Sequence, residues 1–437
     1  MSGSLRDMAP ARAVWTVAWP MAALGILRAF YLLTDSYWVG RLGPAPLAAI
    51  GGAAFGWWMI VLSCELAATG AHSRIARHVG AGRLDAIPHT LASATAVGLV
   101  VAAALAALYP ARGVYFDLLG FERGAPELAH GSAYLGASLL GASTLALHAV
   151  VGAAFRGLGD TRTALALTAV TLVINAALDP WLIWGGAGVP ALGVAGAAWA
   201  TAIANVFGAV VGALILLRRG HALTRGRAAV KAAIEIARIG APISGSGMGF
   251  ALVYVLLCNL ISRYGPEHIA ALGVGHRLEG LAYLTCVAFG VGSATMVGQH
   301  LGAEAPAQAK AAAHAAARLA LGAMVPFTLG YLALAEPLFS LFTDDPAIVS
   351  AGAAYLRVQA LVLVFMALEE VFKGAFTGAG RTLAASVVSF GFTALRLPAA
   401  WLLAVHAGWG IDGVWIAIAG STAIKGALLA LLWRRPG

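Results

Sequence analysis

The chain has 437 residues, 60% of them hydrophobic and only 11% charged, and a mean hydropathy of +0.84. Soluble domains carry about 25% charged residues, so this composition excludes an ordinary soluble protein and predicts membrane-spanning helices of about 20 apolar residues each. The net charge of +9 suggests a nucleic-acid partner, but the basic residues gather at the ends of alternate apolar runs, as the positive-inside rule requires. We therefore expect an all-α polytopic protein of the inner (cytoplasmic) membrane, with both termini in the cytoplasm and no nucleic acid bound.

Twelve apolar segments long enough to cross a bilayer follow one another along the chain. A long basic stretch separates the sixth from the seventh. We therefore expect an N-terminal six-helix bundle over residues 1–217, a cytoplasmic linker over 218–234 and a C-terminal six-helix bundle over 235–437. The predicted spans are 14–40, 46–72, 88–109, 127–153, 162–184, 192–217, 235–262, 268–296, 311–334, 349–373, 383–406 and 412–433.

The two halves of the chain repeat one another. The stretch "RLGPAPLAAIG" (41–51) matches "RYGPEHIAALG" (263–273), which begins 222 positions later, and "FRGLGDT" (155–161) matches "FTGAGRT" (376–382). Because each half has six spans, equivalent helices run in the same direction, so the repeat is parallel about an axis normal to the membrane. Two facing six-helix bundles predict an alternating-access transporter.

The first span carries an acid, Asp35, within "YLLTDSYWVGRLG" (31–43). A carboxylate at membrane depth is costly unless it is paired, protonated or in contact with water. One interpretation is an interfacial acid, since Arg41 follows six residues later near the outer end of the span. The other is a binding site for a coupling cation, and the local sequence alone leaves both open.

Several motifs in order give the chain a resemblance that covers nearly its whole length. They are Pro20 with Asp35, the repeat motifs above, "NAALDP" (175–180) and "GVAGAAWAT" (193–201). On these the chain resembles the multidrug and toxic compound extrusion (MATE) family of cation-coupled exporters. Its acids fall in the first half, which is similar to the DinF-like branch. The resemblance implies a pseudo-symmetric twelve-helix fold, no enzymatic activity, and no cofactor beyond a coupling ion, H⁺ or Na⁺.

The resemblance also implies roles for individual residues. In DinF-like members an Asp fifteen positions after a proline of the first span couples cation binding to bending of that helix. Asp35 stands fifteen positions after Pro20, which is thereby implied to be the hinge. The other positions that match cation-coupling residues of the family are Tyr31, Asn175, Asp179 and Thr201.

Physical reasoning about the fifth span agrees with these roles. Asn175 and Asp179 are four residues apart and project from one helix face. Pro180 has no N–H, which leaves the carbonyl of Ala176 without its usual helical partner. With Asp35, these oxygen atoms suit a hard cation such as Na⁺. Alternatively, two carboxylates in a poorly solvated pocket raise each other's proton affinity, and protonation is the switch.

The second half departs from this pattern. Leu257 stands at the position equivalent to Asp35, and Arg396 at the position equivalent to Asn175, so we expect two chemically different lobes. In the first half, Arg28 lies seven residues before Asp35 on roughly the same helix face, where it would neutralise that carboxylate.

Other charged residues within spans are candidates for a substrate cavity. Glu369 aligns with His148 in the repeat, which suggests opposed polar positions around a substrate, and Glu65 has no charged neighbour on its own helix. Glu370 is better explained by an i,i+3 ion pair with Lys373. The set of cavity candidates is Arg28, Glu65, His148 and Glu369.

The sequence therefore predicts a monomeric secondary antiporter that exports amphipathic, cationic organic compounds by alternating access, coupled to H⁺ or Na⁺. The alternative keeps the fold but takes a lipid-linked saccharide as its substrate, because Arg28, Arg357 and Arg396 fall within spans. An intramembrane enzyme is disfavoured, since the sequence contains no metal motif or nucleophile–base spacing.

Overall fold

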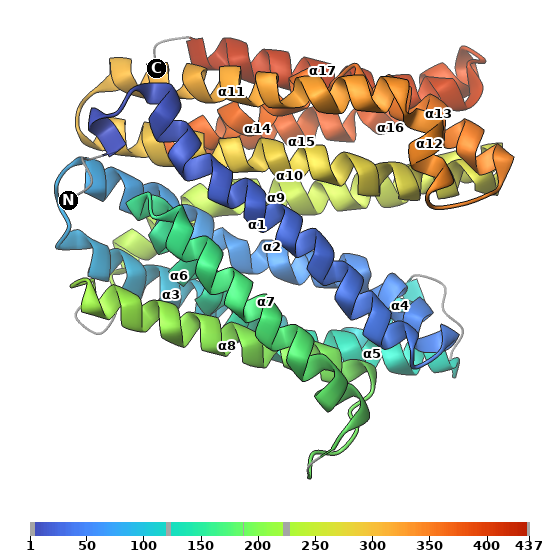
Figure 1. Ribbon diagram of the computed structural model, residues 1–437, viewed down its shortest axis with the longest axis horizontal. Coiled ribbons are helices and arrows are strands. Elements are labelled where there is room, and N and C mark those ends of the chain that lie inside the picture. The colour runs from blue at the N-terminus through green and yellow to red at the C-terminus, as the bar shows by residue number, and fades with distance from the viewer. Residues whose placement is uncertain (1–4, 119–123, 187, 222–227, 435–437) are drawn as a thin grey trace. The chain divides into compact units, whose positions relative to one another are not determined.

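The computed structural model describes residues 5–118, 124–186, 188–221 and 228–434, and within these ranges the side chains of residues 28–36 and 44 are not described. The described residues form helices and contain no β-strand beyond an isolated bridge between Gly186 and Val189 (Figure 1). The elements are η1 (Leu5–Asp7), α1 (Pro10–Gly40), α2 (Pro44–Gly80), α3 (Ala86–Ala106), η2 (Tyr109–Ala111), α4 (Arg112–Leu118), α5 (Pro126–Leu140), α6 (Ala142–Leu158), α7 (Thr161–Trp184), α8 (Val194–Arg218), α9 (Val230–Ile261), η4 (Ser262–Tyr264), α10 (Pro266–Gly302), α11 (Pro306–Ala333), α12 (Ala335–Ser340), α13 (Pro346–Ala360), α14 (Leu363–Gly378), α15 (Thr382–Ala394), α16 (Arg396–Trp401), η5 (Leu402–His406) and α17 (Gly410–Arg434).

These helices account for every predicted span. Over the described residues, nine helices are long and apolar enough to cross a membrane, and two bent pairs, α5 with α6 and α13 with α14, bring the number to eleven. Helix α1, with 31 residues, covers the first predicted span. The all-α twelve-helix membrane fold is therefore confirmed. The short helices α4 and α12 were not predicted.

The chain divides into two compact units, which we call the N-lobe (Ile26–Ser244) and the C-lobe (Met1–Gly25 with Gly245–Gly437). Two helices contribute to both lobes, because the boundaries fall inside α1 and inside α9. Each of these helices contains a proline shortly before the boundary, Pro20 in α1 and Pro242 in α9. A proline in a helix removes one backbone hydrogen bond and favours a bend at that point.

The predicted linker, residues 218–234, lies partly outside the described residues. The structure describes the end of α8 at Arg218 and the beginning of α9 at Val230, but not residues 222–227. The division of the chain into two bundles at this linker stays a prediction.

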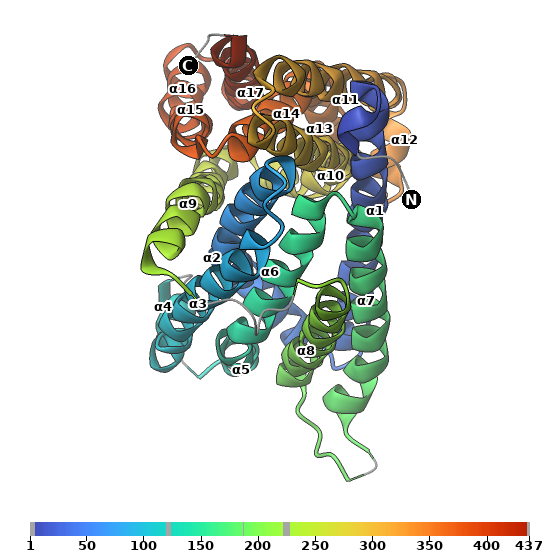
Figure 2. The same ribbon diagram turned by 90° about the vertical axis from the view of Figure 1, so that its left-hand side faces the viewer.

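Two predicted spans are bent in the structure. Helices α5 and α6 meet at Gly141 with an angle of 50°, and α13 and α14 meet with an angle of 54°. In the N-lobe, α6, α7 and α8 lie side by side (Figure 2). Small residues allow this packing, since a Cβ on Gly141 would lie 3.1 Å from the Cβ of Ala202 on α8. The bend and the α7–α8 pair together frame the polar residues described next.

Candidate functional site

Helices α7 and α8 of the N-lobe bring together three of the predicted cation-coupling residues. Asn175 Nδ2 donates a hydrogen bond to Asp179 Oδ1 at 2.8 Å, and Thr201 Oγ1 donates to Asn175 Oδ1 at 3.0 Å. Asp179 is 0% exposed and Asn175 is 2% exposed, within otherwise apolar helices. The i,i+4 spacing on α7 places both side chains on the face that meets α8, as the sequence predicts.

The carboxylate fixes the direction of this chain of hydrogen bonds. An ionised Asp only accepts, so Asn175 must turn its NH₂ group to Asp179 and its carbonyl to α8. Thr201 must then donate its only proton to that carbonyl. The orientation of all three groups therefore depends on whether Asp179 is charged.

Pro180 adds a backbone oxygen next to this chain. It lies inside α7 and has no N–H to donate to the carbonyl of Ala176, one turn earlier. The carboxylate, amide, hydroxyl and carbonyl oxygens available here are the ligands that a hard cation prefers. The residues therefore fit Na⁺, and the buried carboxylate among them also fits a proton.

The row of polar side chains on α7 that includes Asn175 and Asp179 extends to a contact that the sequence did not predict. Thr171, one turn before Asn175, is buried and donates to the carbonyl of Leu167 at 2.8 Å. A Cβ placed on Gly208 of α8 would lie 2.5 Å from both Thr171 Oγ1 and His148 Nδ1. Gly208 thus allows His148 of α6 to approach α7 and α8. The i,i+4,i+8 spacing of Thr171, Asn175 and Asp179 could have predicted that Thr171 shares the helix face of the other two.

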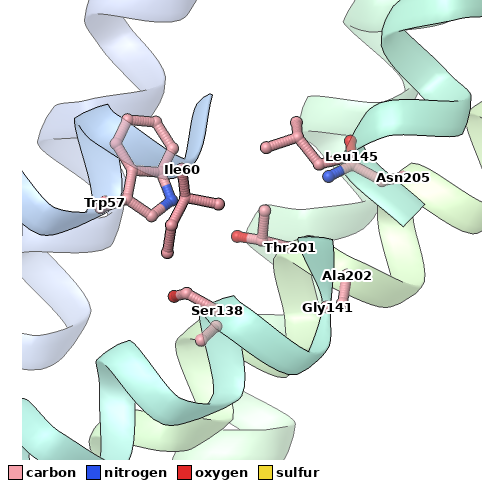
Figure 3. Close-up of a pocket in the computed structure, with 9 residues that line it drawn as sticks. Trp57, Ile60, Ser138, Gly141, Leu145, Thr201, Ala202 and Asn205 are labelled. Carbon is pink, nitrogen blue, oxygen red and sulfur yellow. The ribbon is translucent and has the colours of Figure 1, made fainter. Parts of the chain in front are cut away.

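A small cavity lies beside Thr201, at the bend between α5 and α6 (Figure 3). Its volume of about 30 Å³ has room for one or two water molecules or a small ion. Thr201 therefore borders both the cavity and the Asn175–Asp179 pair. The lining residues are Trp57, Ile60, Ser138, Gly141, Leu145, Ala198, Thr201, Ala202 and Asn205.

The remaining predicted residues of α1 are only partly described. The backbone of residues 28–36 is helical, but the side chains of Arg28, Tyr31 and Asp35 lie outside the described residues. Their proposed contacts stay predictions. Pro20 lies within α1 and is buried.

Three acids of the predicted spans have basic partners. Glu65 Oε2 of α2 lies 3.7 Å from Arg156 Nη2 of α6, and Glu369 Oε2 of α14 lies 2.9 Å from Lys425 Nζ of α17. Glu370 pairs with Lys373, which confirms the predicted i,i+3 interaction. The cavity roles predicted for Glu65, His148 and Glu369 stay predictions, and Lys425 was missed.

The C-lobe position equivalent to Asn175 holds a buried cation. Arg396 of α16 is 2% exposed and donates to the hydroxyls of Ser421 at 2.6 Å, Thr422 at 2.8 Å and Tyr254 at 2.9 Å. None of these partners carries a negative charge. A fourth hydroxyl, that of Tyr355, donates to the carboxylate of Glu279 at 2.8 Å.

An ion pair between Asp160, which precedes α7, and Arg219, which follows α8, joins the two helices outside the predicted spans. We call this pair the clamp. Asp160 caps α7 by accepting from Thr163 N at 3.1 Å, and Arg219 Nη1 donates to Asp160 Oδ2 at 2.6 Å. Burial raises the pKa of Asp160, but the hydrogen bonds from Thr163 and Arg219 outweigh burial and hold that pKa below its ordinary value. The clamp thus contains an ionised acid at neutral pH.

Comparison with known proteins identifies the framework around this site. The MatE family model matches residues 20–181 and 242–402, and the two matches begin 222 positions apart, as the repeat does. The chain belongs to the MatE family. It is therefore a multi-pass membrane transporter and not an enzyme. The family model does not separate branches, so the DinF-like assignment stays a prediction.

Relatives in the MatE family match over most of their length. A probable multidrug resistance protein NorM from Thermotoga maritima is 26% identical over 421 residues, covering 95% of this chain and 90% of that protein. An FAD transporter from Shewanella oneidensis is 27% identical, covering 92% and 86%.

Solved structures show the same fold. A MOP superfamily transporter from Pyrococcus furiosus, described as having a binding pocket of reverse polarity, has a TM-score of 0.90 at 22% identity, covering 98% of this chain and 96% of that one. A MATE structure in complex with MaL6 has a TM-score of 0.89 at 23% identity, covering 98% and 97%.

Proposed function

We propose that this MatE transporter is a cation-coupled antiporter that exports small amphipathic organic compounds, chiefly cationic ones, by alternating access. The observation that carries the proposal is the buried chain from Thr201 through Asn175 to Asp179. A fully buried carboxylate on an apolar helix is costly, and such residues in membrane proteins mark ion or proton pathways. The names of two relatives, multidrug resistance proteins NorM and PmpM, support organic compounds as the cargo.

In the proposed mechanism, Asp179 takes up the coupling ion, either H⁺ or Na⁺. An ion on this carboxylate competes for the oxygen that orients Asn175: a proton makes Asp179 a donor as well as an acceptor, and Na⁺ occupies its lone pairs. Asn175 is then free to turn its amide, and Thr201 no longer has to donate to it. We propose that Asp35 of α1 joins the bound ion and that α1 bends at Pro20 in response. The ion has to bind one conformation more tightly than the other for this exchange to drive transport.

The same proposal includes the setting of the protein. It works as a monomer in the inner membrane, with both termini in the cytoplasm and with no cofactor other than the coupling ion. The basic residues at the ends of alternate spans support this orientation.

Transport into and out of proteoliposomes tests the proposal. A fluorescent organic cation is supplied, and a pH gradient and a sodium gradient are imposed separately. We expect one of the two gradients to drive transport and Asp179→Asn to reduce the driven rate at least about tenfold, the effect of 1.4 kcal/mol on a barrier. Asp344→Asn, at an exposed loop position, is the matched control. Equal driven rates for Asp179→Asn and the control would remove Asp179 from the coupling role.

A second candidate is an anionic substrate, including the lipid-linked saccharide class. Arg396 favours it, because a buried guanidinium with hydroxyl partners leaves its charge available to an anionic group. The relative named as an FAD transporter also supports it. Arg357, in contrast, is paired with Glu336 at 2.9 Å. Competition of FAD against the organic cation distinguishes the candidates, because an anion exporter requires FAD to compete and Arg396→Gln to abolish that competition.

A further inference from the structure

The cavity beside Thr201 lies where a membrane span is broken. Helix α5 ends at Leu140 and α6 begins at Ala142, and the hydroxyl of Thr144 donates to the carbonyl of Gly141 at 2.8 Å. Irregular backbone inside a span is tolerated where protein buries it or where it lines a hydrated cavity. The cavity of about 30 Å³ at this break therefore has a size and a location suited to a small polar guest.

Two hydroxyls of the cavity wall have already donated their protons elsewhere. Ser138 Oγ donates to the carbonyl of Tyr134 at 2.9 Å, and Thr201 Oγ1 donates to Asn175 Oδ1 at 3.0 Å. A hydroxyl has one proton and two lone pairs. What remains for the cavity is oxygen lone pairs, which attract a hydrogen-bond donor or a cation.

The third polar side chain of the wall is Asn205. It is 7% exposed and lines the cavity with Thr201. A buried amide requires hydrogen-bond partners, and a ligand, ion or water in the cavity would supply one. Figure 3 shows Asn205 and Thr201 reaching the cavity from the same helix, α8, while Trp57 and Ile60 form its wall on α2.

We propose that this cavity is a transit site for the coupling cation, which the oxygens of Ser138, Thr201 and Asn205 hold on its way to Asp179. The guest is a small monovalent cation, either Na⁺ with its water or a hydronium ion, because all three ligands are neutral oxygen atoms. This inference rests on the proposed function.

A cation at this site acts on Asp179 through the existing hydrogen bonds. Its positive charge polarises the Thr201 hydroxyl, and that strengthens the donation to Asn175 and from Asn175 to Asp179. Occupancy of the cavity and ionisation of Asp179 thus favour one another. The cavity therefore binds the ion more tightly while Asp179 is ionised.

Binding of ²²Na⁺ to the purified full-length protein at fixed pH, and the pH profile of sodium-free transport, test the site separately for Na⁺ and for hydronium. We expect Asn205→Leu to weaken the apparent affinity for the ion that the wild type uses about tenfold, and Ser138→Ala to weaken it less. Ser63→Ala is the matched control, because Ser63 makes the same bond to the carbonyl four residues earlier but lies outside the cavity. We expect no change for Ser63→Ala.

Asn205→Asp separates ion binding from packing. It keeps the ligand oxygen and adds negative charge, so we expect an affinity equal to the wild type or tighter. A loss as large as that of Asn205→Leu would assign Asn205 to packing and overturn the proposal. If Asn205→Leu changes neither the ²²Na⁺ affinity nor the pH profile of sodium-free transport, the cavity holds water only. That result also overturns the proposal. Failure of the proposed function is distinct, because then neither gradient drives transport by the wild type.

Discussion

The N-lobe and the C-lobe place different chemistry at equivalent positions of the repeat. In the N-lobe, His148 of α6 and Thr171 of α7 meet at Gly208 of α8. In the C-lobe, Glu369 of α14 lies 2.9 Å from Lys425 of α17, whose Nζ lies 3.4 Å from Thr393 Oγ1 of α15. Glu369 aligns with His148 at the offset of 221 that "FRGLGDT" and "FTGAGRT" give. Lys425 aligns with Gly208 at the offset of 217 between "GVAGAAWA" (193–200) and "GIDGVWIA" (410–417).

This difference shows how one framework serves two purposes. The C-lobe cluster supplies its own counterion, so it is electrically complete without a ligand. In the N-lobe, Thr201, Asn175 and Asp179 are joined by hydrogen bonds that neutral groups donate toward a carboxylate. We therefore expect ion-dependent behaviour in the N-lobe and ion-independent stability in the C-lobe.

The largest expected effect comes from breaking the C-lobe pair. Lys425→Ala leaves the buried carboxylate of Glu369 without its partner, and removing one member of a buried pair destabilises by about 3–5 kcal/mol. The Tm of the purified protein measures this loss. The double variant Glu369→Gln with Lys425→Met is the control, because it removes both charges, and we expect it to recover most of the Tm. A Tm that stays low in the double variant would show that packing, not charge, is responsible.

The next effect concerns the N-lobe contact at Gly208. A Cβ there would lie 2.5 Å from His148 Nδ1 and Thr171 Oγ1, so Gly208→Ala forces the helices apart at about 1–3 kcal/mol. Gly420→Ala on α17 is the matched control, because no atom lies within 4 Å of its added Cβ. That change is expected to be neutral or stabilising, since alanine favours helix. Equal Tm values for the two variants would contradict the close approach at Gly208.

The two helices that belong to both lobes, α1 and α9, each contain a proline, so the effect of removing it can be compared between them. Pro20→Ala restores a helical hydrogen bond in α1 and opposes bending, so we expect the driven transport rate to fall about tenfold, or 1.4 kcal/mol. Pro242→Ala makes the same change in α9, where Leu257 replaces the acid, and we expect a smaller loss. Pro326→Ala in α11, a helix confined to the C-lobe, is the control. Losses of equal size in all three variants would argue against a hinge specific to α1.

The sequence predicted the fold more completely than the chemistry of the site. Hydropathy located all twelve spans because each helix that crosses the bilayer must be long and apolar and must satisfy its backbone hydrogen bonds internally. The i,i+4 spacing predicted that Asn175 and Asp179 share a face, and the structure confirms their contact. Lys425 and Asn205 were missed, because their importance depends on neighbours from other helices. Periodicity along one helix carries no information about those neighbours.

The smallest effect concerns the clamp between α7 and α8. The pKa of Asp160 is below the ordinary value of 3.8, so the clamp stabilises the fold at neutral pH and loses that effect as the pH falls from 3.8 through the lower folded pKa. Both side chains are partly exposed, so we expect Asp160→Asn to cost less than about 1 kcal/mol at pH 7. The Tm difference from the wild type should shrink as the pH falls below 4. The repeat places Arg381 here in the C-lobe. Arg381→Gln should therefore show no such narrowing, and a parallel pH response in both variants would contradict a carboxylate clamp specific to the N-lobe.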